Sequence, residues 1–239
     1  MLVDLLIRKL ENPTADSIVI LIGALLCIAL PYLIGSMNPA IIFSKLIYHD
    51  DIRTHGSGNA GTTNMLRTFG AKAAVLTLSC DFLKAIIAVF LGNLILGLGG
   101  MGGSIAGFFV VFGHMFPIFY NFKGGKGVAC AGMVALAIHP FIFLFLVFIF
   151  LTVAIGTRLV SLASVMCALF YPMLFKWFAP HVNLSVVMAF LIMVFVIFMH
   201  RENLKRIWEH KEAKLDLSKF SRKKKKQDKE SAEQKEDQK

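Results

Sequence analysis

The sequence has few charged residues, and this scarcity excludes an ordinary soluble domain. Of its 239 residues, 17% are Asp, Glu, Lys or Arg and 56% are apolar, with a mean hydropathy of +0.69. Soluble domains contain about 25% charged residues. Here the apolar residues form long runs, which match a lipid environment. The net charge of +10 does not indicate nucleic acid as a partner, because the basic residues flank these runs and reflect membrane topology.

Patterns for disulfides, metal sites and serine hydrolases are also missing. The four cysteines lie singly inside apolar runs without paired spacing, which is typical of packed side chains. The seven histidines form no His-x-x-x-His pattern, and the sequence has no Gly-x-Ser-x-Gly element. These absences exclude the common zinc-site and serine-hydrolase motifs. We expect neither a metal nor a cofactor.

Seven apolar segments are present, and they predict an all-α integral membrane protein, a compact bundle of about seven transmembrane helices. Several segments are shorter than the ~20 residues that cross a bilayer upright, so some helices should end inside the protein beside a polar cavity. Residues 41–48 can continue the first helix beyond a break. The segments cover roughly residues 17–34, 71–96, 104–113, 128–138, 141–156, 162–178 and 184–199.

The distribution of Lys and Arg predicts the orientation of this bundle. One side would carry only Arg8, Lys9 and Lys176, whereas the loops and the tail on the other side hold nearly all the remaining cations. Such an excess marks the cytoplasmic side, which places the N-terminus outside and the C-terminus in the cytoplasm. The chain then divides into a short external segment (1–15), a membrane domain (16–210) and a basic cytoplasmic tail (211–239). We expect this tail to be disordered and attracted to anionic lipid.

Residues 53–67 contain the first of two glycine-rich loops between apolar segments. Glycine lets backbone N–H groups turn toward one point, and Ser, Thr and Asn add neutral donors around it. Two arginines add positive charge, so the loop predicts a site for phosphate or another oxyanion. A polar connection between two membrane helices is the alternative interpretation. The candidate ligands are Arg53, Gly56, Ser57, Gly58, Asn59, Gly61, Asn64 and Arg67.

The second loop, residues 123–127, has the sequence Lys-Gly-Gly-Lys-Gly. It resembles the nucleotide-binding Walker A loop only superficially, because Tyr120 stands where a glycine is required and Gly127 where Ser or Thr would hold magnesium. ATP chemistry is therefore not expected. Phosphate binding is expected, since two lysines bracket glycines in front of an apolar helix. Lysines that merely reach the membrane edge are the alternative. The candidate ligands are His114, Lys123, Gly124, Gly125, Lys126 and Gly127.

Two further pairs of polar residues have helical spacing. Asp81 and Lys84 lie inside an apolar segment, where a charge costs about 2.5–3.5 kcal/mol, so both should face protein or water. They form either an internal ion pair or part of the phosphate site. His200 and Asn203 lie three residues apart on a helix that leaves the membrane, so we expect both to face the same cavity.

Three motifs in these regions resemble those of the bacterial acyl-phosphate-dependent glycerol-3-phosphate acyltransferases (PlsY type). The first spans residues 51–67 and the second residues 113–129, and the likeness extends from about residue 35 to residue 212. The sequence departs from the family pattern at Thr62, where alanine is usual, and at residues 210–211, where His-Lys replaces Gly-Thr. The third motif includes His200, Asn203 and Arg206.

The resemblance implies transfer of a fatty acyl group from acyl phosphate to the 1-hydroxyl of glycerol 3-phosphate, which gives lysophosphatidic acid and inorganic phosphate for phospholipid synthesis. It implies a multi-pass enzyme of the bacterial inner membrane, with a cytoplasmic active site and no use of acyl-CoA. We expect a monomer among membrane lipids. By position, Ser161 and Ser164 would lie near the phosphate. The residues that would carry catalysis are Ser57, Arg67, Lys126, His200 and Asn203.

The chemistry fits the residues. An acyl phosphate is a mixed anhydride and already activated, so alignment and electrostatic stabilisation of two phosphates can supply the catalysis. Either the departing phosphate or His200 would take the hydroxyl proton. A carrier or channel for a phosphorylated metabolite is the competing class, but no inverted repeat of broken helices is evident. A His-x-x-x-x-Asp acyltransferase is a weaker rival, because none of the seven histidines has Asp five residues later.

Overall fold

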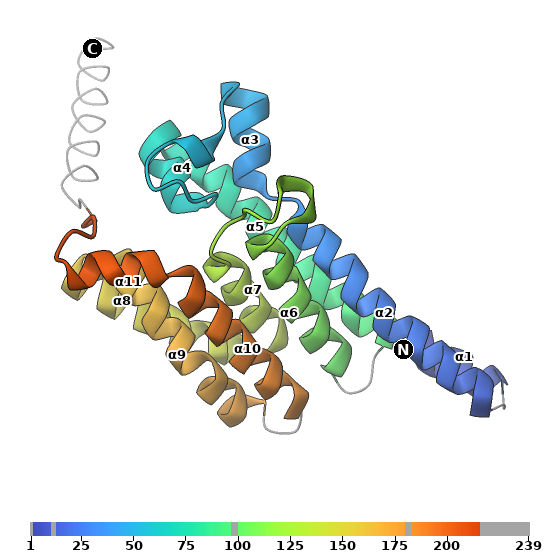
Figure 1. The fold of residues 1–239 in the computed structure, drawn as a ribbon. Coiled ribbons are helices and arrows are strands. Elements are labelled where there is room, and N and C mark those ends of the chain that lie inside the picture. The colour runs from blue at the N-terminus through green and yellow to red at the C-terminus, as the bar shows by residue number, and fades with distance from the viewer. Residues whose placement is uncertain (1, 11–12, 97–99, 180–182, 216–239) are drawn as a thin grey trace, which may run out of the picture.

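The computed structural model describes residues 2–10, 13–96, 100–179 and 183–215, and all regular structure in them is helical. Figure 1 shows the helices as an elongated bundle with α1 at one end and α3 and α4 at the other. The helices are α1 (Leu2–Leu10), α2 (Pro13–Ser36), α3 (Pro39–Tyr48), α4 (Thr62–Phe69), α5 (Ala71–Leu96), α6 (Met101–Met115), α7 (Val128–Ile138), α8 (Pro140–Thr157), α9 (Val160–Phe178), α10 (Asn183–Met199) and α11 (Arg201–Trp208), with short 3-10 turns at Ile52–Thr54 and Ile118–Tyr120.

Several of these helices are long and apolar enough to cross a membrane. Among the described residues, five stretches qualify, and a sixth results if α10 and α11 form one span bent by 54°. Helix α7 has 11 residues and is too short to cross a bilayer alone. The prediction of an all-α, multi-pass integral membrane protein is confirmed. Each predicted apolar segment contains a helix, whereas a total of seven spans and the orientation of the termini stay predictions. The five stretches are Asp16–Tyr48, Ala71–Leu96, Met101–Tyr120, Pro140–Thr157 and Val160–Phe178.

Residues 2–10 of the N-terminal segment form a continuous helix, which lies outside the seven apolar segments from which helices were predicted. Val3 is buried at 3% exposure, and a Cβ added to Gly23 of α2 would lie 2.6 Å from its side chain. Cys27 of α2 and Leu96 of α5 complete this small cluster. The close contact packs α1 onto α2. An external position for this segment stays a prediction.

Close helix packing fixes the end of α2 beside the end of α6. A Cβ on Gly35 would lie 2.2 Å from the carbonyl oxygen of Val110, and a Cβ on Gly113 would lie 2.2 Å from that of Tyr32. Small residues let membrane helices approach in this way where no hydrophobic driving force holds them together. The hydroxyl of Tyr32 also donates to the carbonyl of Phe116, at 2.9 Å. The two chain segments that follow these helix ends therefore start close together.

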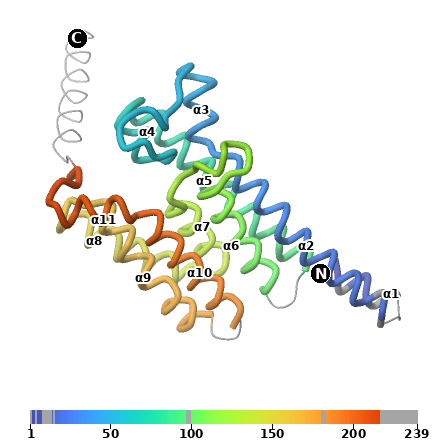
Figure 2. Tube along the Cα trace, in the orientation of Figure 1, coloured from blue at the N-terminus to red at the C-terminus, as the bar shows by residue number. Residues whose placement is uncertain are grey.

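Two apolar clusters support the two glycine-rich loops. The larger one joins helices α5 to α10 and includes fully buried Met115, Val134 and Ile142. The smaller one lies beneath the first loop and is formed by Ala40, Ile41, Ile52, Ala60, Met65 and Ala73. Figure 2 shows α3, α4 and the loop before α7 gathered at one end of the molecule, away from α1. The fold thus brings both loops to the same end of the bundle.

Candidate active site

The first loop is folded around a buried asparagine. Asn64, which is 1% exposed, accepts a hydrogen bond from the backbone N–H of Ser57 and donates to the carbonyls of Ile52 and His55, all at 2.9–3.0 Å. Gly56 has a φ of +58°, and a Cβ there would lie 2.2 Å from the Asn64 side-chain oxygen. Glycine is required at this point because L side chains rarely adopt such a φ. Asn64 therefore shapes the loop through its side-chain amide.

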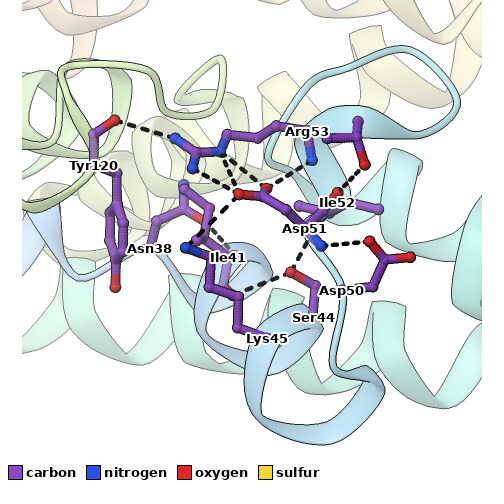
Figure 3. Close-up of polar contacts among 10 residues, drawn as sticks. Asn38, Ile41, Ser44, Lys45, Asp50, Asp51, Ile52, Arg53 and Tyr120 are labelled. Carbon is purple, nitrogen blue, oxygen red and sulfur yellow. Dashed lines mark hydrogen bonds and ion pairs between the residues drawn. The ribbon is translucent and has the colours of Figure 1, made fainter.

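A hydrogen bond from Arg53 connects the first loop to Tyr120, just before the second loop, as Figure 3 shows. The carboxylate of Asp51 accepts from Nε and Nη2 of Arg53, at 3.0 and 2.7 Å, and Nη1 of Arg53 donates to the carbonyl of Tyr120 at 3.1 Å. The hydrogen bond from Arg53 lowers the pKa of Asp51 to about 2. Lys45 lies 3.8 Å from the same carboxylate. The guanidinium of Arg53 is thus held between the loops and is absent from the cavity lining described below.

The second loop lies flat against the end of α6. The N–H of Gly124 donates to the carbonyl of Met115 at 3.2 Å, and that of Gly125 donates to the carbonyl of His114 at 3.0 Å. A Cβ on Gly124 or Gly125 would collide with His114, at 2.1 Å in both cases. These glycines therefore permit close packing, and their N–H groups are not available to an anion. Gly127, with a φ of +77°, turns the chain into α7.

The two loops share one cavity of about 430 Å³. Its polar end is lined by both loops, by the start of α9 and by the residues around α11. Six of the predicted ligands do not line it, and of these Lys123 is exposed. The predicted residues outside the lining are Arg53, Gly56, Gly58, Lys123, Gly124 and Gly125. The predicted residues in the lining are Ser57, Asn59, Gly61, Asn64, Arg67, His114, Lys126, Gly127, Ser161, Ser164, His200 and Asn203.

A hydrogen-bonded network joins the second loop to α9 and α11. Lys126 Nζ donates to the side-chain oxygen of Asn203, whose amide nitrogen donates to Ser161 Oγ at 2.8 Å and to Glu212 Oε1 at 2.7 Å. Ser161 also donates to Glu212 at 2.5 Å. Burial lowers the pKa of Lys126 to about 8. This network fixes the ammonium group of Lys126 at the cavity wall.

Glu212 is a cavity residue that sequence reasoning missed. Burial would raise the pKa of its carboxyl, but hydrogen bonds from Ser161, Asn203 and Arg206 outweigh this effect and leave the pKa below its usual value. Arg206 Nε lies 2.7 Å from Glu212 Oε2. Residue 212 falls in the predicted tail, where no helical period places it near Asn203. Residues 216–239 of that tail lie outside the described residues.

His200 lies at the bend between α10 and α11, where it is 2% exposed and lines the cavity. Its Nδ1 is 2.8 Å from the carbonyl oxygen of Val196. A carbonyl can only accept, so Nδ1 carries a proton and Nε2 of the neutral ring is an acceptor. The ring is therefore set up to take a proton from a group inside the cavity.

Asp81 and Lys84 form an internal ion pair that includes His114. Lys84 Nζ lies 2.8 Å from Asp81 Oδ1 and 2.9 Å from His114 Nδ1, and it also donates to the carbonyls of Gly35 and Met37. The cluster thus ties the end of α2 to α5 and α6. The side chains of Asp81, His114 and Cys130 could group around a metal ion. Because the ammonium of Lys84 already supplies a positive charge there, an ion pair explains this cluster better than a metal site.

The fold and the cavity together define a class of protein. The polar end offers two cationic side chains, hydroxyls, amides and a histidine to an anionic group. The other end is lined by apolar side chains from α5, α7, α8, α9 and α10. A multi-pass membrane protein with such a cavity is suited to an amphiphile that has a phosphate head and a hydrocarbon tail.

Comparison with known proteins narrows this class to a family. The profile of the family described as "Glycerol-3-phosphate acyltransferase" matches residues 25–210. The glycerol-3-phosphate acyltransferases of Neisseria meningitidis (strain FAM18) and Bacillus subtilis (strain 168) are 40% and 41% identical to this chain over 191 and 190 residues. These alignments cover 79% and 80% of this chain and 95% and 96% of the relatives. The chain belongs to the glycerol-3-phosphate acyltransferase family.

Solved structures agree with this assignment. The crystal structure of PlsY, described as an integral membrane glycerol 3-phosphate acyltransferase in its glycerol 3-phosphate form, has a TM-score of 0.77 and 34% sequence identity to this chain. The alignment covers 82% of this chain and 98% of the PlsY chain. The lysophosphatidic acid form of PlsY has a TM-score of 0.73 at the same identity. The family profile, which matches residues 25–210, includes both loops.

Proposed function

We propose that this protein transfers a fatty acyl group from an acyl phosphate to the 1-hydroxyl of glycerol 3-phosphate, which yields lysophosphatidic acid and inorganic phosphate. The observation that carries the proposal is the single cavity in which two phosphate-type loops meet an apolar compartment. Both substrates have phosphate groups, and one has a hydrocarbon chain as well. Glycerol 3-phosphate is also the substrate named for the relatives and for the PlsY structure.

Cationic side chains at the polar end would hold the two phosphates. Two unit charges about 7 Å apart repel by about 2 kcal/mol at an effective dielectric of 20, so both phosphates need positive neighbours. Arg67 and Lys126 supply these charges from the two loops, and the side chains of Ser57 and Asn59 add neutral donors. Asn203 positions Lys126, because both amide hydrogens of Asn203 are already donated within the protein. Arg53 and Asn64 act indirectly in this proposal, because their side chains hold the loops in shape.

The acyl transfer needs neither ATP nor a metal in this proposal. The glycerol 1-hydroxyl oxygen attacks the acyl carbonyl carbon, the bond from that carbon to the phosphate oxygen breaks, and phosphate leaves with the bonding electrons. The hydroxyl proton passes either to the departing phosphate or to Nε2 of His200. Nε2 can accept it because the other ring nitrogen, Nδ1, donates to the carbonyl of Val196. Arg67 and Lys126 would stabilise the negative charge that moves onto the leaving phosphate.

The acyl chain would reach the cavity from the bilayer. The apolar half of the lining includes Val147 and Leu151 of the apolar helix α8, and these two residues are 36% and 49% exposed at the outside of the bundle. A hydrocarbon tail can thus enter sideways while its phosphate stays at the polar end. We also propose a bacterial inner-membrane location with the cavity facing the cytoplasm. The loops that line the polar end of the cavity belong to the side of the bundle that carries the excess of Lys and Arg, and such an excess marks the cytoplasmic side. The protein would act as a monomer.

One assay tests the proposal. The purified protein in detergent receives palmitoyl phosphate and glycerol 3-phosphate, and the release of phosphate is followed together with lysophosphatidic acid. We expect both products, no phosphate release without glycerol 3-phosphate, and no transfer from palmitoyl-CoA. Transfer from palmitoyl-CoA alone would overturn the choice of donor. Uptake of glycerol 3-phosphate into proteoliposomes without acylation would support the carrier class instead.

A further inference from the structure

The apolar half of the cavity is long and has an uneven wall. It runs beside α9 from Ser161 to Tyr171, ten residues apart, which corresponds to about 15 Å at 1.5 Å per residue. Large side chains form most of this wall, and they come from four helices. They include Phe82, Met133, Phe143, Leu146, Phe150 and Tyr171.

Gly132 of α7 interrupts this wall of large side chains. Among the described residues that line the apolar half it is the one glycine, whereas Gly61 and Gly127 belong to the loops at the polar end. A Cβ on Gly132 would meet only the ring of Phe143, at 3.8 Å, which is ordinary van der Waals distance. By contrast, a Cβ on Gly107 of α6 would lie 2.6 Å from Val134. Helix packing therefore does not require glycine at position 132.

Backbone conformation does not require this glycine either. Gly132 lies in the interior of α7 and is not among the glycines with positive φ. Glycine destabilises a helix interior relative to alanine, so a glycine that stands here without a packing or backbone reason points to the space that it leaves. That space lies between α7 and Phe143 of α8, about 7.5 Å further along α7 than Gly127.

We propose that Gly132 determines the length of the acyl chain that the enzyme accepts. The open space beside it admits the part of a long fatty acyl chain that extends beyond this depth, whereas a side chain there would narrow the path between α7 and α8. Shorter chains end before this point and do not need the space. The inference rests on the proposed acyl-phosphate function and adds to it the residue that determines how long an acyl chain the cavity accepts.

The test compares acyl phosphates of different length on matched variants. Gly132→Leu should lower kcat/KM for palmitoyl phosphate about 10- to 100-fold and leave butanoyl phosphate, whose chain ends before the depth of Gly132, within about twofold of wild type. Gly132→Ala should show the same trend on a smaller scale. Gly156→Leu is the control, because Gly156 lies on α8 outside the cavity lining and a Cβ there would have no neighbour within 4 Å. Its chain-length profile should equal that of wild type.

Retained activity with butanoyl phosphate shows that Gly132→Leu is folded, and Gly132→Ala serves if the larger substitution prevents folding. An unchanged chain-length profile in an active Gly132→Leu variant would overturn the inference, as would an equal loss with both donors. Wild type that turns over no acyl phosphate would instead overturn the proposed function. In that case, thermal unfolding tests the acyl-length role separately. Palmitoyl phosphate should raise the unfolding temperature of wild type but not that of Gly132→Leu, and an equal rise in both proteins would refute the role.

Discussion

Arg67 and Arg53 belong to the same loop, but their guanidinium groups have different surroundings. Arg53 is paired with Asp51 and bonded to the carbonyl of Tyr120. Arg67 lines the cavity, and no hydrogen bond or ion pair engages it within the described part of the chain. A guanidinium that is charged at every accessible pH and free of partners is the better phosphate ligand. Arg67 is therefore the arginine that we assign to substrate.

Arg67→Ala should lower kcat/KM at least about 100-fold, because a charge-assisted contact to the phosphates is lost. Phosphate release from palmitoyl phosphate measures this effect. Arg201→Ala is the matched control, since Arg201 is exposed over the ring of Phe198 and lies outside the cavity lining. The control should stay within about twofold of wild type. Arg67→Ala activity above about one tenth of wild type would refute the assignment.

The buried ammonium of Lys126 predicts a pH dependence. Its pKa is lowered to about 8, so the free enzyme loses this positive charge as the pH rises through 8 and not near 10.5. The affinity for phosphate should fall with it, and KM should rise between pH 7.5 and about 9.5, by up to about tenfold per pH unit above the pKa. Lys126→Arg remains charged over this range, and its KM should be nearly independent of pH. A wild-type KM that is flat to about pH 9.5 would contradict this role.

His200 can be tested as the proton acceptor. If Nε2 takes the proton, His200→Ala should lower kcat about 100-fold across pH 6–8, since general-base catalysis typically contributes 10²- to 10⁴-fold. His49→Asn is the control, because His49 is an exposed residue at the end of α3 and Asn tolerates its left-handed conformation. Normal turnover of His200→Ala over this range would exclude the histidine and leave the departing phosphate as the acceptor.

At the scale of elements, Arg53, which Asp51 holds in place, joins the first loop to the carbonyl of Tyr120 just before the second loop. Arg53→Ala removes the bridge to Tyr120 without removing a cavity residue. We therefore expect KM for glycerol 3-phosphate to rise about tenfold while kcat changes less than about threefold, as measured by steady-state kinetics. The double variant with Asp51→Ala should be no worse than either single variant, because the two residues act as one unit.

The opposite kinetic split would give Arg53 a different role. A large fall in kcat with unchanged KM would mean that Arg53 contacts the phosphates in the transition state, as the loop sequence alone suggested. Lys cannot reproduce the forked geometry of the guanidinium, so Arg53→Lys should behave like Arg53→Ala if the bridge is what matters. Full rescue by Lys would indicate that only the positive charge is needed.

The loops also show how far the sequence predicts this site. Residue types and their order predicted two phosphate-type loops, and this role stays a prediction. The structure shows that residues of both loops line one cavity. The partner of each charged or amide group could not be predicted. Arg53 forms an ion pair with Asp51. The side chain of Asn64 and the N–H groups of Gly124 and Gly125 form hydrogen bonds with backbone groups. Such pairing depends on three-dimensional contacts, which residue spacing in a loop does not determine.

At the scale of the whole molecule, apolar runs predicted the helices well, because in lipid every backbone polar group must be satisfied within the segment. The regular helix at residues 2–10 and the return of Glu212 to the cavity were not predicted. Glu212 reaches the site because the chain turns back after α11, where its N–H bonds to the carbonyl of Arg206. A mixed-charge sequence carries no hydrophobic period that could reveal such a turn.

The whole molecule brings a charged compartment and a hydrocarbon compartment into one cavity. Only this continuity lets a phosphate and the acyl chain attached to it be held at once. The central claim is therefore that cleavage of the acyl phosphate and acylation of glycerol 3-phosphate are one event at this site.

The most direct measurement uses purified protein with phosphorus-labelled palmitoyl phosphate and carbon-labelled glycerol 3-phosphate. Equal amounts of released phosphate and lysophosphatidic acid are predicted at every time point, with both lost together in Arg67→Ala. Phosphate release that proceeds without glycerol 3-phosphate, or acylation without phosphate release, would contradict a single shared site.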